Sequence, residues 1–276
     1  MKVKTPKKIA VINSFAGFGR CSITVALPVI SAMRVQACPV PTSILSNHLA
    51  FPHCHFDDYT DRMPDYLDTW QQLDLSFDGI LCGFLGSVRQ IQIVEDFIGK
   101  QSASHPVVII DPVMGDHGKA YRTITPEHCE AMKNLVKSAD IITPNITEAC
   151  LLTDTPYHES SWNKDSLEAL SAALHAMGPS HVVITGIMEP GHFINYVSYD
   201  DIACTCSTPI AGESRPGTGD IFASIIAADA VNKTAFLTSV KKAADFIRTC
   251  TKASSQADIP VREGVCFENF LHLLVL

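Results

Sequence analysis

The chain has 276 residues, of which 46% are hydrophobic and 18% are charged, and its formal net charge at pH 7 is -8. An apolar share of this size supports a substantial core and excludes global disorder. The acidic balance gives no basic surface of the kind that nucleic-acid binding needs, so we expect no nucleic-acid partner. ATP remains compatible with this charge, because main-chain N–H groups, a helix amino terminus and a metal ion create locally positive sites.

The sequence contains no pattern typical of export or membrane insertion. The apolar run at residues 9–12 is too short for the core of a signal peptide, and no stretch reaches the uninterrupted apolar length of a membrane span. The ten cysteines are scattered and lack the paired spacings of structural zinc sites. We therefore expect a cytoplasmic protein with reduced thiols and no membrane partner.

Short runs rich in isoleucine and valine alternate along the chain with longer stretches of helical periodicity. The predicted strands are residues 8–13, 79–82, 107–111, 141–143 and 181–185. The predicted helices are residues 22–33, 64–73, 88–99, 126–137, 165–177, 218–231 and 234–250. This alternation is typical of βαβ units around a mostly parallel sheet and predicts one α/β domain over residues 1–276. Residues 191–206 depart from it and predict a β-hairpin that turns at Tyr199, Asp200 and Asp201.

Polar residues or glycines follow every predicted strand. They are Asn13 and Ser14, Gly83, Asp111, residues 143–145, and Thr185 with Gly186. Turns favour such residues for reasons of their own. Ligands of open α/β sheets, however, bind where the strands end. The joint placement of these residues therefore predicts one shared cleft.

The segment Arg-Pro-Gly-Thr-Gly-Asp at residues 215–220 leads directly into a run of apolar and small residues. Glycines allow close approach of the main chain to a phosphate, and the first N–H groups of a helix are unpaired. The segment predicts an anion hole at Gly217, Thr218 and Gly219, with Asp220 placed to take a proton from a substrate hydroxyl. Taken alone, the pattern fits equally well a helix cap formed by Thr218 or Asp220. Neither a P-loop nor the protein-kinase motif set is present.

Residues 215–220 resemble the signature of the ribokinase-like superfamily. Asp-Pro-Val-Met-Gly-Asp at residues 111–116 and Thr-Pro-Asn-Ile-Thr-Glu at residues 143–148 extend the resemblance to the pyridoxal/pyridoxamine kinases. The three segments follow one another in the order of that family, and the resemblance covers most of the chain. It implies a three-layer α/β/α ribokinase-like fold with a mostly parallel central sheet. It also implies ATP-dependent phosphorylation of the 5′-hydroxymethyl group of pyridoxal, pyridoxamine or pyridoxine.

The resemblance further implies roles for individual residues. Asp220 would be the catalytic base, beside an anion hole of Gly217, Thr218 and Gly219. ATP and its phosphates would lie against Asp111, Asp116, Thr143, Asn145, Glu148, Thr185 and Thr218. The vitamer would lie against Ser14, Thr42, Tyr121 and Asp220. Mg2+ would be held by Asp111 and by Glu148, the latter directly or through water. A monovalent cation such as K+ and a homodimer are further expectations from the family.

Two features depart from the pyridoxal-kinase pattern and leave the substrate open. Residues 116–121 form a shorter lid than in many members, and Phe15 follows Ser14 where many members have histidine. A hydroxymethylpyrimidine kinase of thiamine synthesis shares the fold and the anion hole, and a sugar or nucleoside kinase is a third alternative. A catalytically silent regulator that binds vitamer or nucleotide is the alternative from another class, although such a protein needs no base at residue 220.

Overall fold

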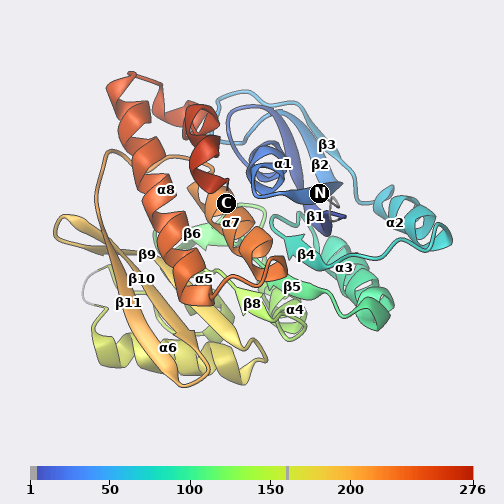
Figure 1. The fold of residues 1–276 in the computed structure, drawn as a ribbon. Helices are drawn as coiled ribbons and strands as arrows, with labels where there is room; N and C mark the ends of the chain where they lie inside the picture. The colour runs from blue at the N-terminus through green and yellow to red at the C-terminus, as the bar shows by residue number, and fades with distance from the viewer. Residues whose placement is uncertain (1–4, 160–161, 276) are drawn as a thin grey trace.

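A mixed β-sheet forms the middle of the molecule. The structure is a computed structural model that describes residues 5–159 and 162–275. Within those residues, nine strands form one sheet in the order β11-β10-β9-β8-β5-β4-β1-β2-β3 (Figure 1). The six strands from β9 to β2 run parallel, whereas β10 pairs antiparallel with β9 and β11, and β3 pairs antiparallel with β2. The bounds are β1 Lys7–Phe18, β2 Val35–Asn47, β3 Phe56–Asp58, β4 Gly79–Cys82, β5 Val107–Ile110, β8 Ile141–Ile142, β9 His181–Glu189, β10 His192–Tyr199 and β11 Ile202–Pro209.

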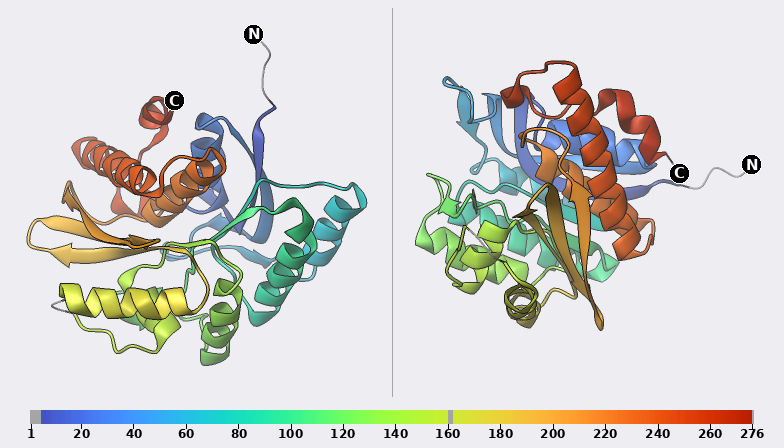
Figure 2. Two further views of the ribbon diagram at one scale, coloured as in Figure 1. Left: turned by 60° about the horizontal axis from the view of Figure 1, so that its bottom comes forward. Right: turned by 90° about the vertical axis from the view of Figure 1, so that its left-hand side faces the viewer.

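Helices cover both faces of this sheet, as Figure 2 shows from two further directions. One face carries α2 Met63–Gln72, α3 Val88–Gln101, α4 Pro126–Val136, α5 Ile146–Thr153 and α6 Lys164–Ala176, and the other carries α1 Ile23–Ala32, α7 Thr218–Val231 and α8 Phe236–Gln256. Successive residues of a strand face opposite sides, so Ala10 and Ile12 of β1 join the first core and Ile9 and Val11 the second. This arrangement confirms the predicted three-layer fold with a mostly parallel sheet. None of the described helices is long and apolar enough to cross a membrane.

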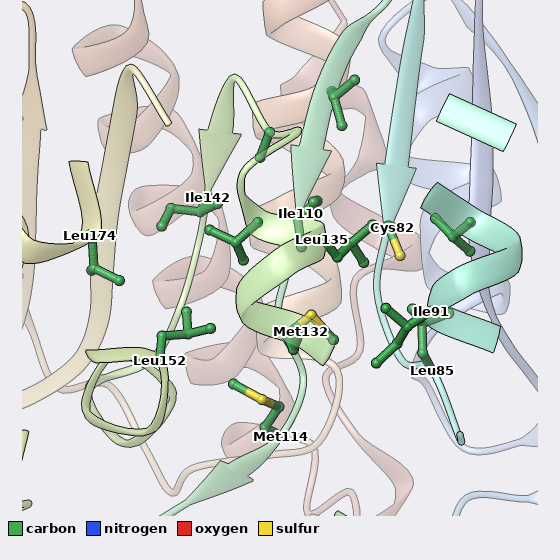
Figure 3. Close-up of a cluster of buried hydrophobic side chains, with 14 of the residues drawn as sticks. Cys82, Leu85, Ile91, Ile110, Met114, Met132, Leu135, Ile142, Leu152 and Leu174 are labelled. Carbon is green, nitrogen blue, oxygen red and sulfur yellow. The ribbon is translucent and has the colours of Figure 1, made fainter. Parts of the chain in front are cut away.

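The core under α2 to α6 is one apolar cluster that extends to the edge of the sheet at which the parallel strands end. Figure 3 shows Ile110 and Ile142 of the sheet together with Leu135 of α4 and Leu152 of α5. Met114 belongs to the same cluster and is wholly buried. Its burial holds the segment between β5 and a small separate hairpin, made of β6 Gly115–Asp116 and β7 Lys119–Ala120.

All five strands and all seven helices predicted from the sequence are present, with end points that differ by a few residues. The predicted hairpin is confirmed, because Tyr199 of β10 lies opposite Ile202 of β11. Its turn contains Asp200 at a φ of 48°, a left-handed conformation that aspartate tolerates. Residues 1–4, 160–161 and 276 of the predicted domain lie outside the described residues.

Two of the longer elements were missing from the sequence prediction, as were the short strands β3, β6 and β7. The first is β2, whose Pro39 and Pro41 argue against a central strand because proline cannot donate a ladder hydrogen bond. They are tolerated because β3 pairs only with residues 43–45, so that the first part of β2 is an edge. The second is the eight-residue helix α5, which begins inside the motif at residues 143–148.

A buried ion pair joins α7 to α8. Asp229 of α7 is completely buried, and its Oδ1 accepts hydrogen bonds from Lys242 Nζ at 2.9 Å and from Thr234 Oγ1 at 3.1 Å. A carboxylate taken out of water needs such partners, because its desolvation is costly. The pair therefore fixes how α8 lies against the helix that begins at the glycine-rich loop.

We predict that Lys242→Ala lowers the free energy of unfolding by about 3 kcal/mol, because it leaves the Asp229 carboxylate buried without its cation. Lys241→Ala, at the exposed neighbouring position, is the matched control and should change stability by less than about 0.5 kcal/mol. Chemical denaturation of the two variants measures both values. Equal effects would show that the ion pair does not stabilise the helix pair.

Candidate active site

The residues predicted to form a shared cleft gather at one edge of the sheet, where neighbouring parallel strands end. They are Asn13 on β1, Gly83 after β4, Asp111 after β5, Thr143 after β8 and Thr185 on β9. Thr143 Oγ1 donates a hydrogen bond to Asp111 Oδ1 at 2.8 Å. Asn13 Nδ2 donates to Asp220 Oδ1 at 3.1 Å, which brings the first turn of α7 to the same edge.

The glycine-rich loop before α7 packs directly against the main chain of an earlier loop. Gly217 has a φ of 85°, and a Cβ added there would overlap the carbonyl oxygen of Arg20, so no side chain fits. Gly217 is also the N-cap of α7, and no side chain caps this helix. The alternative role of Thr218 or Asp220 as a helix cap is therefore wrong. The first N–H groups of α7 remain available to an anion, as the anion-hole prediction requires.

Arg215 ties this loop to a segment about fifty residues further along the chain. Its side chain is buried, and Nη1 donates to the carbonyl oxygens of Ile259 at 2.9 Å, Pro260 at 3.3 Å and Gly264 at 3.3 Å. Thr218 Oγ1 in turn donates to the Arg215 carbonyl oxygen at 3.2 Å. The loop is thus held from both ends, which fixes the direction of its N–H groups.

Three acidic side chains lie close enough to influence one another. Burial and, to a smaller extent, the nearby Asp220 raise the pKa of Asp111 to about 7, against the hydrogen bond from Thr143, which lowers it. Burial also raises the pKa of Asp220, whereas hydrogen bonds from the Ser22 main chain and from Asn13 lower it. The pKa of Glu148 lies well above its usual range because of burial and the charge of Asp111. Such crowding of carboxylates favours the binding of cations.

Both oxygens of Glu148 already accept main-chain hydrogen bonds. Oε1 accepts from Met114 N at 3.1 Å and Oε2 from Asn145 N at 2.8 Å, while Asn145 Oδ1 accepts from Glu148 N at 3.0 Å. Asn145 and Glu148 therefore form a capping box at the start of α5. This geometry favours contact of Glu148 with a metal through water over direct ligation. Across the described residues, no group of three or more His, Cys, Asp or Glu side chains is arranged to hold a metal on protein atoms alone.

Asn13 was predicted to line the shared cleft, but it was given no catalytic or binding role. Its Oδ1 accepts from Ser14 N at 2.8 Å and from Phe84 N at 3.1 Å, and these two bonds leave Nδ2 pointing at Asp220. A Cβ on Gly83 would overlap this amide, so the glycine after β4 makes room for it. The sequence signal for a role of Asn13 in the site was its position at the end of a strand, in line with the polar residues that follow the other strands.

The two hydroxyls expected to bind the vitamer ring are engaged within the protein. Ser14 Oγ donates to Ser22 Oγ at 2.8 Å, and Thr42 Oγ1 donates to the Phe84 carbonyl oxygen at 3.0 Å. Thr42 is completely buried and Ser14 nearly so. Their contact with substrate stays a prediction, and it requires the free lone pairs of each hydroxyl.

The lid expected at residues 116–121 is the small hairpin of β6 and β7. Gly118 N donates to Thr147 Oγ1 at 2.9 Å, and Asn145 Nδ2 donates to the Gly115 carbonyl oxygen at 2.8 Å. Asp116 and Tyr121 at the two ends of the hairpin are exposed. Separately, Thr185 N on β9 donates a hydrogen bond to the Pro144 carbonyl oxygen at 2.8 Å. The short lid is therefore attached to the first turn of α5.

Comparison with known proteins shows to which family the chain belongs. The sequence profile of the phosphomethylpyrimidine kinase family matches residues 23–262. The chain belongs to this family. It is similar to a pyridoxal kinase of Leifsonia xyli, with 28% identity over 85% of this chain and 85% of the relative.

Two solved structures also resemble this chain closely. A candidate phosphomethylpyrimidine kinase of Bacteroides thetaiotaomicron, solved with pyridoxal, is 36% identical with a TM-score of 0.94, over 99% of this chain and 96% of that chain. The pyridoxal kinase of Lactobacillus plantarum is 27% identical with a TM-score of 0.91, over 98% and 97%. The predicted relationship to pyridoxal kinases and the ribokinase-like fold are thereby confirmed.

We predict that Gly217→Ala in this phosphomethylpyrimidine kinase family member costs about 2 kcal/mol more stability than Gly191→Ala. Both glycines have a positive φ, 85° and 79°, but a Cβ meets nothing within 4 Å at Gly191 and overlaps the Arg20 carbonyl at Gly217. The control variant therefore carries the strain of the φ angle alone, on the order of 1 kcal/mol. Urea denaturation gives the difference. Equal losses would mean that the loop can move away from Arg20 at no cost.

A second prediction concerns Asp111 and is tested with a chelator present. The Asp111 carboxyl has a pKa near 4 in the unfolded chain and about 7 in the folded protein. Between these two pH values the folded state therefore binds a proton that the unfolded state has already lost. Stability contributed by Asp111 is accordingly lost as the pH rises from 4 to 7. Asp111→Asn should raise the free energy of unfolding at pH 8 by roughly 2 kcal/mol and much less at pH 4.5. A gain independent of pH would contradict the raised pKa.

Proposed function

We propose that the chain transfers the γ-phosphoryl group of ATP to the 5′-hydroxymethyl group of a B6 vitamer. The observation that carries this proposal is the pairing of Asp220 with the uncapped amino terminus of α7 at the carboxyl edge of the parallel sheet. A base and an anion hole on the same helix turn suit an alcohol that attacks a phosphate bound beside it. Family membership and the similarity to pyridoxal kinases support the choice of vitamer as substrate.

In the proposed reaction the N–H groups of residues 217–219 stabilise the negative charge on the transferred phosphoryl group. Asp220 accepts the hydroxyl proton, and Asn13 holds its carboxylate toward the sheet edge. The raised pKa of Asp220 suits a base, because the carboxylate binds the proton more strongly than an exposed aspartate does. The chain thereby supplies alignment, charge stabilisation and proton transfer from one helix turn and one strand end.

The residues also fit a magnesium ion on the phosphate side. Asp111 Oδ1 is held by Thr143, whereas no described residue donates a hydrogen bond to Oδ2, which faces Gly219. Mg2+ typically binds one or two carboxylates and completes its shell with water and substrate phosphates, which matches Asp111 with Glu148 acting through water. When bound, the ion would neutralise phosphate charge. K+ binding and a homodimer stay predictions from the family.

The function is tested by ADP release with Mg2+ and ATP on a panel of acceptor alcohols. Pyridoxal, pyridoxamine, pyridoxine and hydroxymethylpyrimidine are compared side by side, with ribose and adenosine as controls. Turnover on at least one B6 vitamer well above ribose and adenosine is expected. Tight vitamer binding without turnover would replace the proposal by a silent regulator.

The second candidate function is phosphorylation of hydroxymethylpyrimidine or its phosphate, and it is favoured by the description of the matching family. The kinase machinery would be the same, and only the ring pocket would differ. A kcat/KM for hydroxymethylpyrimidine at least about tenfold above that for every B6 vitamer would select this alternative.

We predict that Asp220→Asn lowers kcat about 10²- to 10⁴-fold, because the amide cannot accept the hydroxyl proton. KM for ATP should change little, since the main-chain anion hole is unaltered. Asp245→Asn, on the exposed face of α8, is the control and should keep wild-type turnover. Near wild-type kcat in Asp220→Asn would remove this residue from the reaction.

A further prediction separates positioning by Asn13 from a purely structural role. Asn13→Leu removes the hydrogen bond that lowers the pKa of Asp220, so that this pKa rises further. The acid limb of the kcat/KM profile should therefore move to higher pH, with kcat reduced about tenfold at neutral pH. In an Asp220→Asn background the same change should have little additional effect. Additive losses in the double variant would mean that Asn13 does not act through Asp220.

A further inference from the structure

Hydrogen bonds in series lead from helix α3 to the proposed base. Gln90 Nε2 of α3 donates to the Thr42 carbonyl oxygen at 2.8 Å, and Thr42 Oγ1 donates to the Phe84 carbonyl oxygen at 3.0 Å. Phe84 N donates to Asn13 Oδ1 at 3.1 Å, and Asn13 Nδ2 donates to Asp220 Oδ1 at 3.1 Å. We call these five residues the positioning network. It connects α3, β2, the loop after β4 and β1 with the first turn of α7.

Phe84 is the link on which the direction of the Asn13 amide depends. It lies just after β4, where the chain leaves the sheet, and both of its main-chain polar groups are held, N–H by Asn13 and C=O by Thr42. Because Asn13 Oδ1 accepts the Phe84 N–H, the amide presents Nδ2 to Asp220. A shift of Phe84 would therefore turn or release the group that holds the proposed base.

Gln90 fastens the other end of the network. Its side chain is almost completely buried, and Oε1 accepts from Gly86 N at 2.7 Å while Nε2 also donates to Thr60 Oγ1 at 2.7 Å. A main-chain N–H only donates and a carbonyl only accepts, so these partners fix which end of the amide faces Gly86 and which faces Thr42. Gln90 thereby ties β2 to the loop two residues beyond Phe84.

The burial of Thr42 argues for a place in this network and against contact with the vitamer ring. The residue has 0% exposed surface, and its hydroxyl proton is directed at the Phe84 carbonyl oxygen. A side chain that recognises a ring must be reachable from the cleft. The adjacent Ser43 is also buried, yet its Oγ makes no hydrogen bond with any described residue. Residue 42 therefore differs from its neighbour in the bond to Phe84.

We propose that Gln90 and Thr42 are positioning residues of the kinase reaction, which hold Phe84 and, through Asn13, the carboxylate of Asp220. The inference rests on the proposed function, because that function makes Asp220 the base. Thr42 then affects how well the base is aligned and leaves recognition of the ring unaffected. A position behind the base and a position at the ring predict opposite changes in the kinetic constants.

Thr42→Val tests this on pyridoxal, pyridoxamine, pyridoxine and hydroxymethylpyrimidine. Valine keeps the size of the side chain and releases the Phe84 carbonyl, so kcat should fall about five- to tenfold, by the same factor for each acceptor that wild type phosphorylates. KM for the acceptor should stay within about twofold. Thr42→Ser keeps the hydroxyl and should retain at least about half of kcat. A raised acceptor KM with unchanged kcat would assign Thr42 to the ring and overturn the proposal.

Ser43→Ala is the matched control, because it removes a hydroxyl without a hydrogen-bond partner from the same strand, and it should keep wild-type kcat. Gln90→Met breaks the other end of the network and should lower kcat about tenfold, whereas Gln92→Met, at an exposed position of the same helix, should not. In an Asn13→Leu background, Thr42→Val should have little additional effect, since its connection to Asp220 is already cut. Additive losses in that double variant would contradict the network.

Amide hydrogen exchange tests the network without turnover. The Phe84 N–H should exchange at least about tenfold faster in Thr42→Val than in wild type, and at the wild-type rate in Ser43→Ala. Unchanged exchange in Thr42→Val would refute the network even if the kinase activity is confirmed. Faster exchange in a protein that phosphorylates none of the acceptors would instead refute the proposed function, and with it the part of Thr42 and Gln90 in catalysis.

Discussion

The contact between Gly217 and the carbonyl oxygen of Arg20 determines the geometry on which the site depends. It allows α7 to start against the end of β1, and only a residue without a side chain can make it. From that starting point the uncapped N–H groups and Asp220 fall beside Asn13 and Asp111. The helix amino terminus then offers positive potential where three carboxylates supply negative charge. The proposed anion and cation sites are thus brought together by one close main-chain approach.

The carboxylates are balanced by main-chain hydrogen bonds more than by basic side chains. Glu148 is satisfied by two N–H groups, Asp111 by the hydroxyl of Thr143, and Asp220 by Ser22 and Asn13. No described lysine or arginine forms an ion pair with any of the three. Their negative charge is therefore free for the cation that we propose to accompany the nucleotide, and the hydrogen-bond donors of the protein keep the carboxylates in place without it.

Sequence reasoning was successful where local chemistry decides structure. The glycine-rich loop at residues 215–220 was predicted, and its local physical cause is the left-handed turn at Gly217. The Asn-x-x-Glu spacing at Asn145 is also a local pattern, that of a capping box, but sequence reasoning did not predict the helix α5 that it starts. It failed where distant segments decide. The prolines in β2 are acceptable only because of which edge they face, and the anchoring of Arg215 depends on carbonyls near residue 260. A cavity at the opposite edge of the sheet has no sequence motif, because its lining residues come from five separate stretches of the chain, 107, 140–141, 180–181, 226–230 and 234–239.

The anchoring of the glycine-rich loop by late residues has a consequence for biosynthesis. Arg215 donates to carbonyls of Ile259, Pro260 and Gly264, while Arg20 N donates to the Glu263 carbonyl oxygen at 3.2 Å and Arg20 Nε pairs with Glu268 at 2.6 Å. Both sides of the proposed anion hole therefore depend on contacts with residues 259–268. During synthesis, the glycine-rich loop therefore reaches its final geometry only after residues 259–268 have been made and have packed against Arg215 and Arg20.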